Sequence, residues 1–205
     1  MAEIKLTKTE LRIQQLKLER LQKYLPTLQL KKAMLQIEVN QAQLEIDALT
    51  QSFAIASEKV SKYSALLTER SAPDLFSAVQ VHSVFRSTEN VAGLDIPVFQ
   101  NIQFDPSTYS LFETPLWFES AILGIKELIT LREKTKISEE KKRALEKELR
   151  EVSIRVNLFE KILIPRSKEN IKKIKIFLGD QQLAAVSQAK VAKKKILLRN
   201  QEGKI

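Results

Sequence analysis

The chain has 205 residues, of which 34 are Lys or Arg and 25 are Asp or Glu, so its net charge is +9 at pH 7. It has no cysteine, which excludes disulfide bonds and thiolate chemistry, and only four glycines and six prolines, which favours long helices. We find neither a signal peptide nor an apolar run near the roughly 18 residues of a membrane span, and therefore expect no direct membrane insertion.

Residues 1–69 are expected to form one long N-terminal helix. Apolar residues recur in alternating steps of three and four over about seven heptads, which predicts a coiled coil, with a helix of a larger bundle as the alternative. Pro26 removes a backbone donor, so we expect a kink or break near Lys23–Pro26. The expected seam consists of Leu18, Leu21, Leu25, Leu28, Leu35, Val39, Ile46, Leu49, Phe53 and Val60.

Residues 70–115 differ from the rest because they contain four of the six prolines. Apolar and polar residues alternate on both sides of a stretch that contains Asn90 and Gly93, two residues that favour turns. This pattern predicts a β-hairpin at about 79–104 with its turn at these two residues. A lone hairpin is marginal in water, so it must pack on the helices or on a partner.

Residues 116–198 are expected to form a second long helix, and residues 199–205 a short tail. Between 132 and 151, 14 of 20 residues are charged, and a heptad pattern then resumes. After Pro165 this pattern slips by one residue and continues to Leu178, followed by a basic segment that ends near Leu198. The expected seam is Leu145, Leu149, Val152, Val156, Phe159 and Leu163.

Two heptad helices on either side of a compact insertion predict an intramolecular antiparallel pair, because the chain must turn back at the insertion. The expected fold is therefore predominantly all-α: a long antiparallel two-helix coiled coil with a short β-hairpin insertion. Both termini would lie at one end, and Val39 would lie near Phe159.

Residues for catalysis or ligand binding are scarce. His82 is the only histidine, so any Ser/His/Asp triad would need this one residue, and a metal cluster would have no second histidine. No glycine-rich phosphate loop occurs. We expect no catalytic residue, no metal and no cofactor. The basic segments 172–175 and 190–195 are interpreted either as a solvated helix face or as a positive helix end inside a protein socket. They lack the interleaved aromatics of a nucleic-acid surface.

Three stretches, in order, resemble the D-subunit family of V/A-type rotary ATPases. They are Leu6–Leu11 with the Leu- and Lys-rich helix that follows, Ser87–Pro97, and the most specific one, Arg155–Arg166 followed by Glu169–Ile174. The resemblance covers essentially the whole chain. The short end after Leu198 is similar to bacterial or archaeal members rather than eukaryotic ones.

This resemblance implies a non-catalytic central-stalk subunit that transmits torque between a nucleotide-binding head and a membrane ion-translocating ring. Its implied partners are the catalytic and non-catalytic subunits of the hexameric head, a small companion stalk subunit and the membrane-ring adaptor, with no nucleic acid. It implies a cytoplasmic place on the inner face of the cell membrane. The expected head contacts, at the helix ends, are Leu6, Lys8, Leu11, Arg12, Lys190, Lys193, Lys194 and Lys195.

Two other functions compete with the rotor shaft. The heptads alone fit a generic coiled-coil scaffold, and the basic charge fits a helical nucleic-acid-binding protein, whose binding to duplex DNA would fall steeply with salt. Co-purification with a nucleotide-binding hexamer would favour the shaft.

Overall fold

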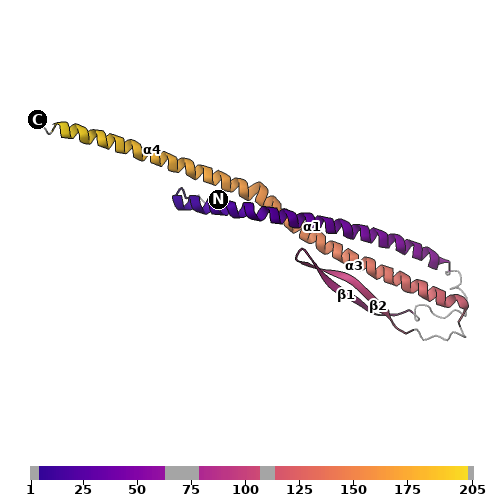
Figure 1. The fold of residues 1–205 in the computed structure, drawn as a ribbon. Coiled ribbons are helices and arrows are strands. Elements are labelled where there is room, and N and C mark those ends of the chain that lie inside the picture. The colour runs from indigo at the N-terminus through magenta and orange to yellow at the C-terminus, as the bar shows by residue number, and fades with distance from the viewer. Residues whose placement is uncertain (1–4, 63–78, 107–113, 203–205) are drawn as a thin grey trace. The chain divides into compact units, whose positions relative to one another are not determined.

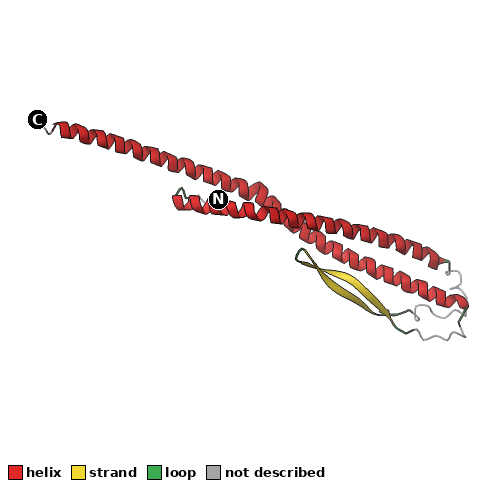
Figure 2. Ribbon diagram, in the orientation of Figure 1, coloured by secondary structure: helices red, strands yellow, loops and turns green. Residues whose placement is uncertain are grey.

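The computed structural model describes residues 5–62, 79–106 and 114–202. It is predominantly helical, with one antiparallel hairpin, which confirms the expected fold class (Figures 1 and 2). The expected features at 63–78, 107–113 and 203–205 lie outside the described residues. The elements are α1 (Lys8–Ser61), β1 (Val81–Val91), β2 (Leu94–Phe104), α3 (Leu116–Leu158), a π-helical turn η2 (Phe159–Leu163) and α4 (Ile164–Glu202).

The chain divides into two compact units. Unit 1 contains Met1–Leu30 and Ser153–Ile205, and unit 2 contains Lys31–Val152. Each unit therefore combines part of α1 with a helical segment from the second half of the sequence.

The helix α1 begins with a side-chain cap and passes through Pro26 without interruption. The backbone N–H of Glu10 donates to Thr7 Oγ1 at 3.2 Å, and this bond satisfies one of the free donors at the helix start. A break near Lys23–Pro26 is therefore wrong, and the alternative, a kink in a continuous helix, stays a prediction. A single proline removes one hydrogen bond from a 54-residue helix, and the flanking Leu25 and Leu28 are both partly buried in the seam.

In unit 2, α1 and α3 pack side by side and antiparallel (Figure 1). Lys31 Nζ lies 2.8 Å from Glu148 Oε1, and Lys141 Nζ lies 3.3 Å from Glu45 Oε2. Between these two pairs, Val39 lies about opposite Leu145. The expectation that Val39 lies near Phe159 is therefore wrong, because heptad spacing repeats and does not select one axial alignment.

The residues expected in the seam are buried or half-buried in both units, and none of the sixteen is exposed. Leu35 and Leu145 are fully enclosed, and Val39 and Val152 are nearly so. Unit 2 thus has an apolar seam of the kind that the 3-4 spacing predicts.

The hairpin turn is a two-residue loop between β1 and β2. Ala92 (φ 51°) and Gly93 (φ 81°) both take left-handed backbone conformations, as in a type I′ turn. Asn90 supports the turn, because its Oδ1 accepts from the Gly93 N–H at 3.1 Å and its Nδ2 donates to Asp95 Oδ1 at 2.6 Å.

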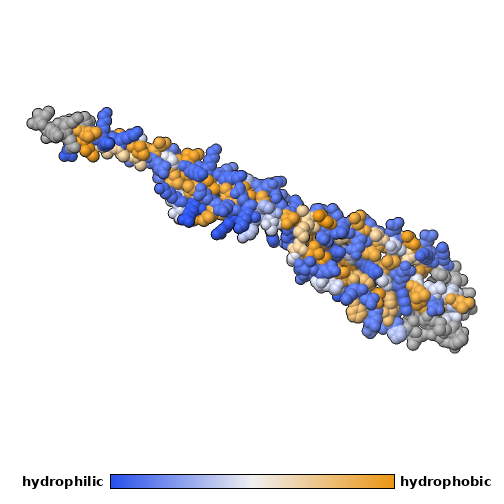
Figure 3. All heavy atoms as spheres, in the orientation of Figure 1, coloured by the Kyte–Doolittle hydropathy of each residue, from blue (hydrophilic) through white to orange (hydrophobic). Residues whose placement is uncertain are grey.

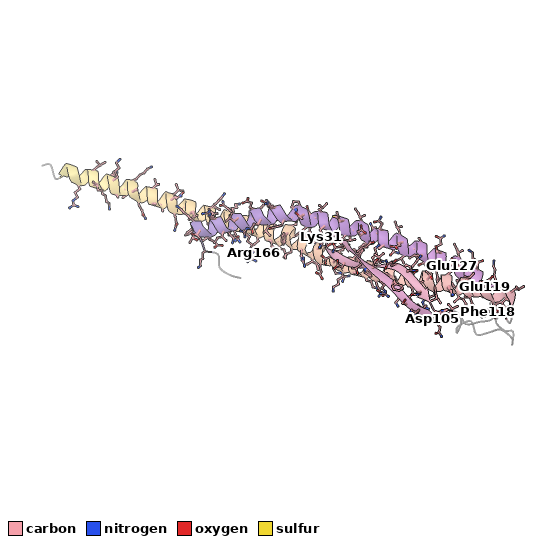
Figure 4. All side chains as sticks on the ribbon, turned by 60° about the horizontal axis from the view of Figure 1, so that its bottom comes forward. Lys31, Asp105, Phe118, Glu119, Glu127 and Arg166 are labelled. Carbon is pink, nitrogen blue, oxygen red and sulfur yellow. The ribbon has the colours of Figure 1, made fainter. Side chains whose placement is uncertain are left out.

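The hairpin packs along α3 in unit 2 (Figure 2). Arg86 Nη1 donates to Glu140 Oε2 at 2.8 Å, and Lys134 Nζ lies 5.3 Å from the centre of the Phe99 ring. At the hairpin base, an apolar cluster includes the fully buried Phe118, which Figure 4 shows at the start of α3. A lone hairpin was expected to need a surface to pack on, and α3 of the same unit provides that surface.

The π turn explains the one-residue slip in the heptad pattern. The Ile164 N–H donates to the Phe159 carbonyl, five residues back, so this turn contains one residue more than an α-helical turn. Beyond it, Ile174 is buried and Ile171 and Leu178 are partly buried. Without the extra residue, the 3-4 spacing would place Arg166 and Lys173 in the seam; in the structure both are exposed (Figure 4 labels Arg166).

Candidate interaction surfaces

The residues expected to contact a catalytic head lie in unit 1, at two different levels. Phe159 lies beside Leu21, so Lys8 is about level with residue 172, and Lys190 lies roughly 27 Å farther along α4. The structure therefore does not bring the basic residues of α4 together with those at the start of α1. Among the expected residues Leu11 is half-buried; the exposed ones are Leu6, Lys8, Arg12, Lys190, Lys193, Lys194 and Lys195.

The last part of α4 continues as a helix beyond the start of α1 (Figure 1). It passes through Gly179, includes the basic segment and ends at Glu202, so residues 199–202, which were expected to belong to a tail, are helical. Every residue from 180 to 197 is exposed. Polar and apolar side chains alternate over this segment (Figure 3), and its large exposed apolar residues are Leu183, Val186, Val191, Ile196 and Leu197.

A second apolar stripe lies on α1 in unit 2, and the leucine seam gave no hint of it. Met34, Ile37, Leu44 and Ile55 are all about half exposed or more, with Leu44 at 68%. Their spacing continues the 3-4 alternation through Gln41, Ala48 and Gln51, on the side of α1 that faces away from the seam. The signal was present in the sequence as a second heptad frame, but the stronger leucine frame masked it.

The described residues contain little that could support catalysis. His82 is largely exposed and its Nδ1 lies 2.9 Å from Asp105 Oδ1, which makes a surface pair at the hairpin base. No group of three or more Asp, Glu or His residues in the described ranges could hold a metal ion. The helices within these ranges also lack an apolar stretch that could span a bilayer.

Comparison with known proteins identifies the family. The sequence pattern of the family of ATP synthase D subunits matches residues 10–194. Proteins named as the D subunit of a V-type ATP synthase, from Chlamydia caviae and Chlamydia felis, are each 42% identical over 202 residues, which cover 98% of this chain and 97% of theirs. The relative of that name from Chlamydia pneumoniae is 40% identical over the same share.

The chain belongs to the ATP synthase D-subunit family. The resemblance inferred from the three ordered stretches is therefore confirmed. In this D-subunit family member, the first stretch caps and begins α1, and the second forms the hairpin turn. The third, most specific stretch contains the whole π turn and three of the seam residues that follow it, Ile164, Ile171 and Ile174.

Proposed function

We propose that the chain is the non-catalytic central shaft of a V-type rotary ATPase and that it transmits torque between a nucleotide-binding head and a membrane ion-translocating ring. Its family membership supports a role in this kind of complex. The proposed place is the cytoplasmic side of the cell membrane, on a complex that makes or hydrolyses ATP and moves protons or sodium ions.

The observation that carries the proposal is the exposed end of α4. A single helix of this length is marginal in water unless a tertiary surface packs against it. Residues 180–197 place large apolar side chains and four lysines on such a helix with all of them exposed. A socket that surrounds the helix would cover the apolar groups on every side, and the central opening of a hexameric head has this form.

The contacts inside unit 2 also suit a shaft. A buried apolar seam, two ion pairs between α1 and α3, and a hairpin anchored on α3 all resist sliding of one helix along the other. Packed side chains at these positions are what allows a helix pair to carry twist from one end to the other.

We further propose that the outward stripe of α1 binds the small companion stalk subunit through an apolar helix. The stripe keeps a heptad alternation, and such spacing suits a second helix rather than an irregular loop. The membrane-ring adaptor is the remaining proposed partner, and no residue of this chain is assigned to it.

The proposal is tested by isolating the tagged full-length chain from its native cells and identifying the co-purifying proteins by mass spectrometry. The shaft predicts recovery of both nucleotide-binding subunits of a hexameric head. A chain that ends before residue 180 is the matched control, and we expect it to lose these subunits but to keep a companion bound to unit 2. Recovery of nucleic acid, or of self-associated chain without a hexamer, would contradict the proposal.

A further inference from the structure

The π turn is a weak point in the backbone ladder of unit 1. Pro165 lies two residues after its last residue, Leu163, and has no N–H to offer to the carbonyls of Glu160 and Lys161, five and four residues earlier. The Ile164 N–H is already donated to Phe159. Fewer backbone bonds therefore hold this turn than hold the regular helix on either side of it.

α1 is weakened at the same level of unit 1. Pro26 offers no N–H to the carbonyl of Gln22, four residues earlier. Phe159, the first residue of the π turn, lines one groove together with Leu21 and Tyr24, which precede Pro26 by five and two residues. Both helices thus lose ladder hydrogen bonds within about one or two turns of the same level.

An open apolar groove also lies at this level. The groove has a volume of about 530 Å³, and its other lining residues are Ile13, Leu16, Lys17 and Arg20. Tyr24 remains 61% exposed, and Ile162 in the π turn is 53% exposed. Dense packing is what makes a helix pair stiff, and because this groove is open to solvent, the turn has less resistance to bending and twisting on that side.

We propose that the level of Tyr24–Pro26 and Phe159–Pro165 is a compliant joint, at which the helix pair bends and twists more readily than elsewhere. The inference rests on the proposed function for its purpose, which is to absorb angular mismatch between the two ends of a rotating shaft. The joint itself is a property of this chain alone.

The decisive variant deletes Ile162 and replaces Pro165 by Ala. The deletion removes the extra residue of the π turn, so the downstream seam residues keep facing α1, and the alanine restores the missing donor. Ile162→Ala is the matched control, since it alters the same exposed side chain but keeps the π turn. Circular dichroism would verify that both variants are as helical as the parent.

The chain has no cysteine, so cysteines introduced at the exposed Ile154 and Lys175 can carry two spin labels across the turn. Pulsed electron paramagnetic resonance on the full chain then gives the width of the distance distribution. We expect the deletion variant to be narrower by about twofold and the control to match the parent. Distance distributions of equal width in the parent, the deletion variant and the control would contradict the proposed joint.

Hydrogen exchange of the amides from residue 161 to 168 provides a second measurement. We expect exchange at least about tenfold slower in the deletion variant than in the control. Equal rates would also overturn the joint. Neither measurement requires a nucleotide-binding head. Failure of the co-purification experiment would therefore contradict the proposed shaft function but not the proposed joint.

Discussion

Gly124 on α3 lies directly against the side chain of Val60 on α1: a Cβ atom at Gly124 would come within 2.7 Å of Val60 Cγ2. This is closer than two carbon atoms can approach without a shift, so the missing side chain is what lets the two helices meet at this level. We expect Gly124→Ala to destabilise the protein by about 1–3 kcal/mol in urea denaturation.

Gly179→Ala provides the control for this prediction. An added Cβ there meets no atom within 4 Å, so the better helix propensity of alanine should stabilise α4 by about 0.5–1 kcal/mol. Val60→Ala combined with Gly124→Ala should recover part of the loss. If Gly124→Ala alone were as stable as the parent, the close approach would be disproved.

The ion pair between Lys31 and Glu148 should contribute to the alignment of α1 on α3. Both side chains are less than one-third exposed, so solvent screens this 2.8 Å pair only in part. We expect Glu148→Gln to cost about 1 kcal/mol, and Lys31→Glu with Glu148→Lys to regain most of it in a double-mutant cycle. The coupling energy between the exposed residues Arg143 and Glu139 should be smaller. If the two coupling energies were equal, the pair of Lys31 and Glu148 would not contribute specially to the alignment of the helices.

Phe99 should decide whether the hairpin stays on α3. Its ring lies under Lys134, and Phe99 lines one groove together with Ile137 and Ser138 of α3. Because these contacts hold the ribbon, Phe99→Ala should raise hydrogen exchange in β1 and β2 at least about tenfold and leave exchange in α1 unchanged. Phe85→Ala, on an exposed residue of β1, should have little effect. Equal exchange in the two variants would show that Phe99 does not anchor the hairpin.

Ala92 should be a site of removable strain. An L-residue with a side chain pays about 1 kcal/mol in the left-handed conformation that Ala92 adopts, whereas glycine does not. We expect Ala92→Gly to stabilise the hairpin by a part of this amount, and Gly93→Ala to destabilise it, in thermal melts that follow the two strands. A destabilising Ala92→Gly would show that the turn is not limited by this strain.

Lys193, Lys194 and Lys195 should matter for assembly more than for folding. All three are exposed on the unpaired part of α4. Their replacement by Gln should leave the melting temperature unchanged and weaken association with the head in a salt-dependent way. Gln at Lys172, Lys173 and Lys175, which are exposed on the paired part of α4, is the control. If the variant with Gln at Lys193, Lys194 and Lys195 assembled normally, the positive charge at the end of α4 would not contribute to binding the head.

The local elements could be predicted from the sequence by itself because they depend on short-range periodicity and turn chemistry. The 3-4 spacing from Leu18 to Val60 predicted α1, and alternation around Asn90 and Gly93 predicted the hairpin. Heptad slippage after Pro165 was visible as well, and so was the family. These signals need only the geometry of one helix or one hairpin.

Only the tertiary structure decided the axial alignment, the helical state of residues 199–202 and the continuity of α1 through Pro26. A heptad repeats every seven residues, so many alignments bury the same seam, and contacts such as Lys31 with Glu148 select one of them. The π turn could not be predicted locally either. It is needed because the seam before it and the seam after it differ by one residue in phase, and both must face α1. Alignment and phase depend on residues far apart in the chain, which no local pattern contains.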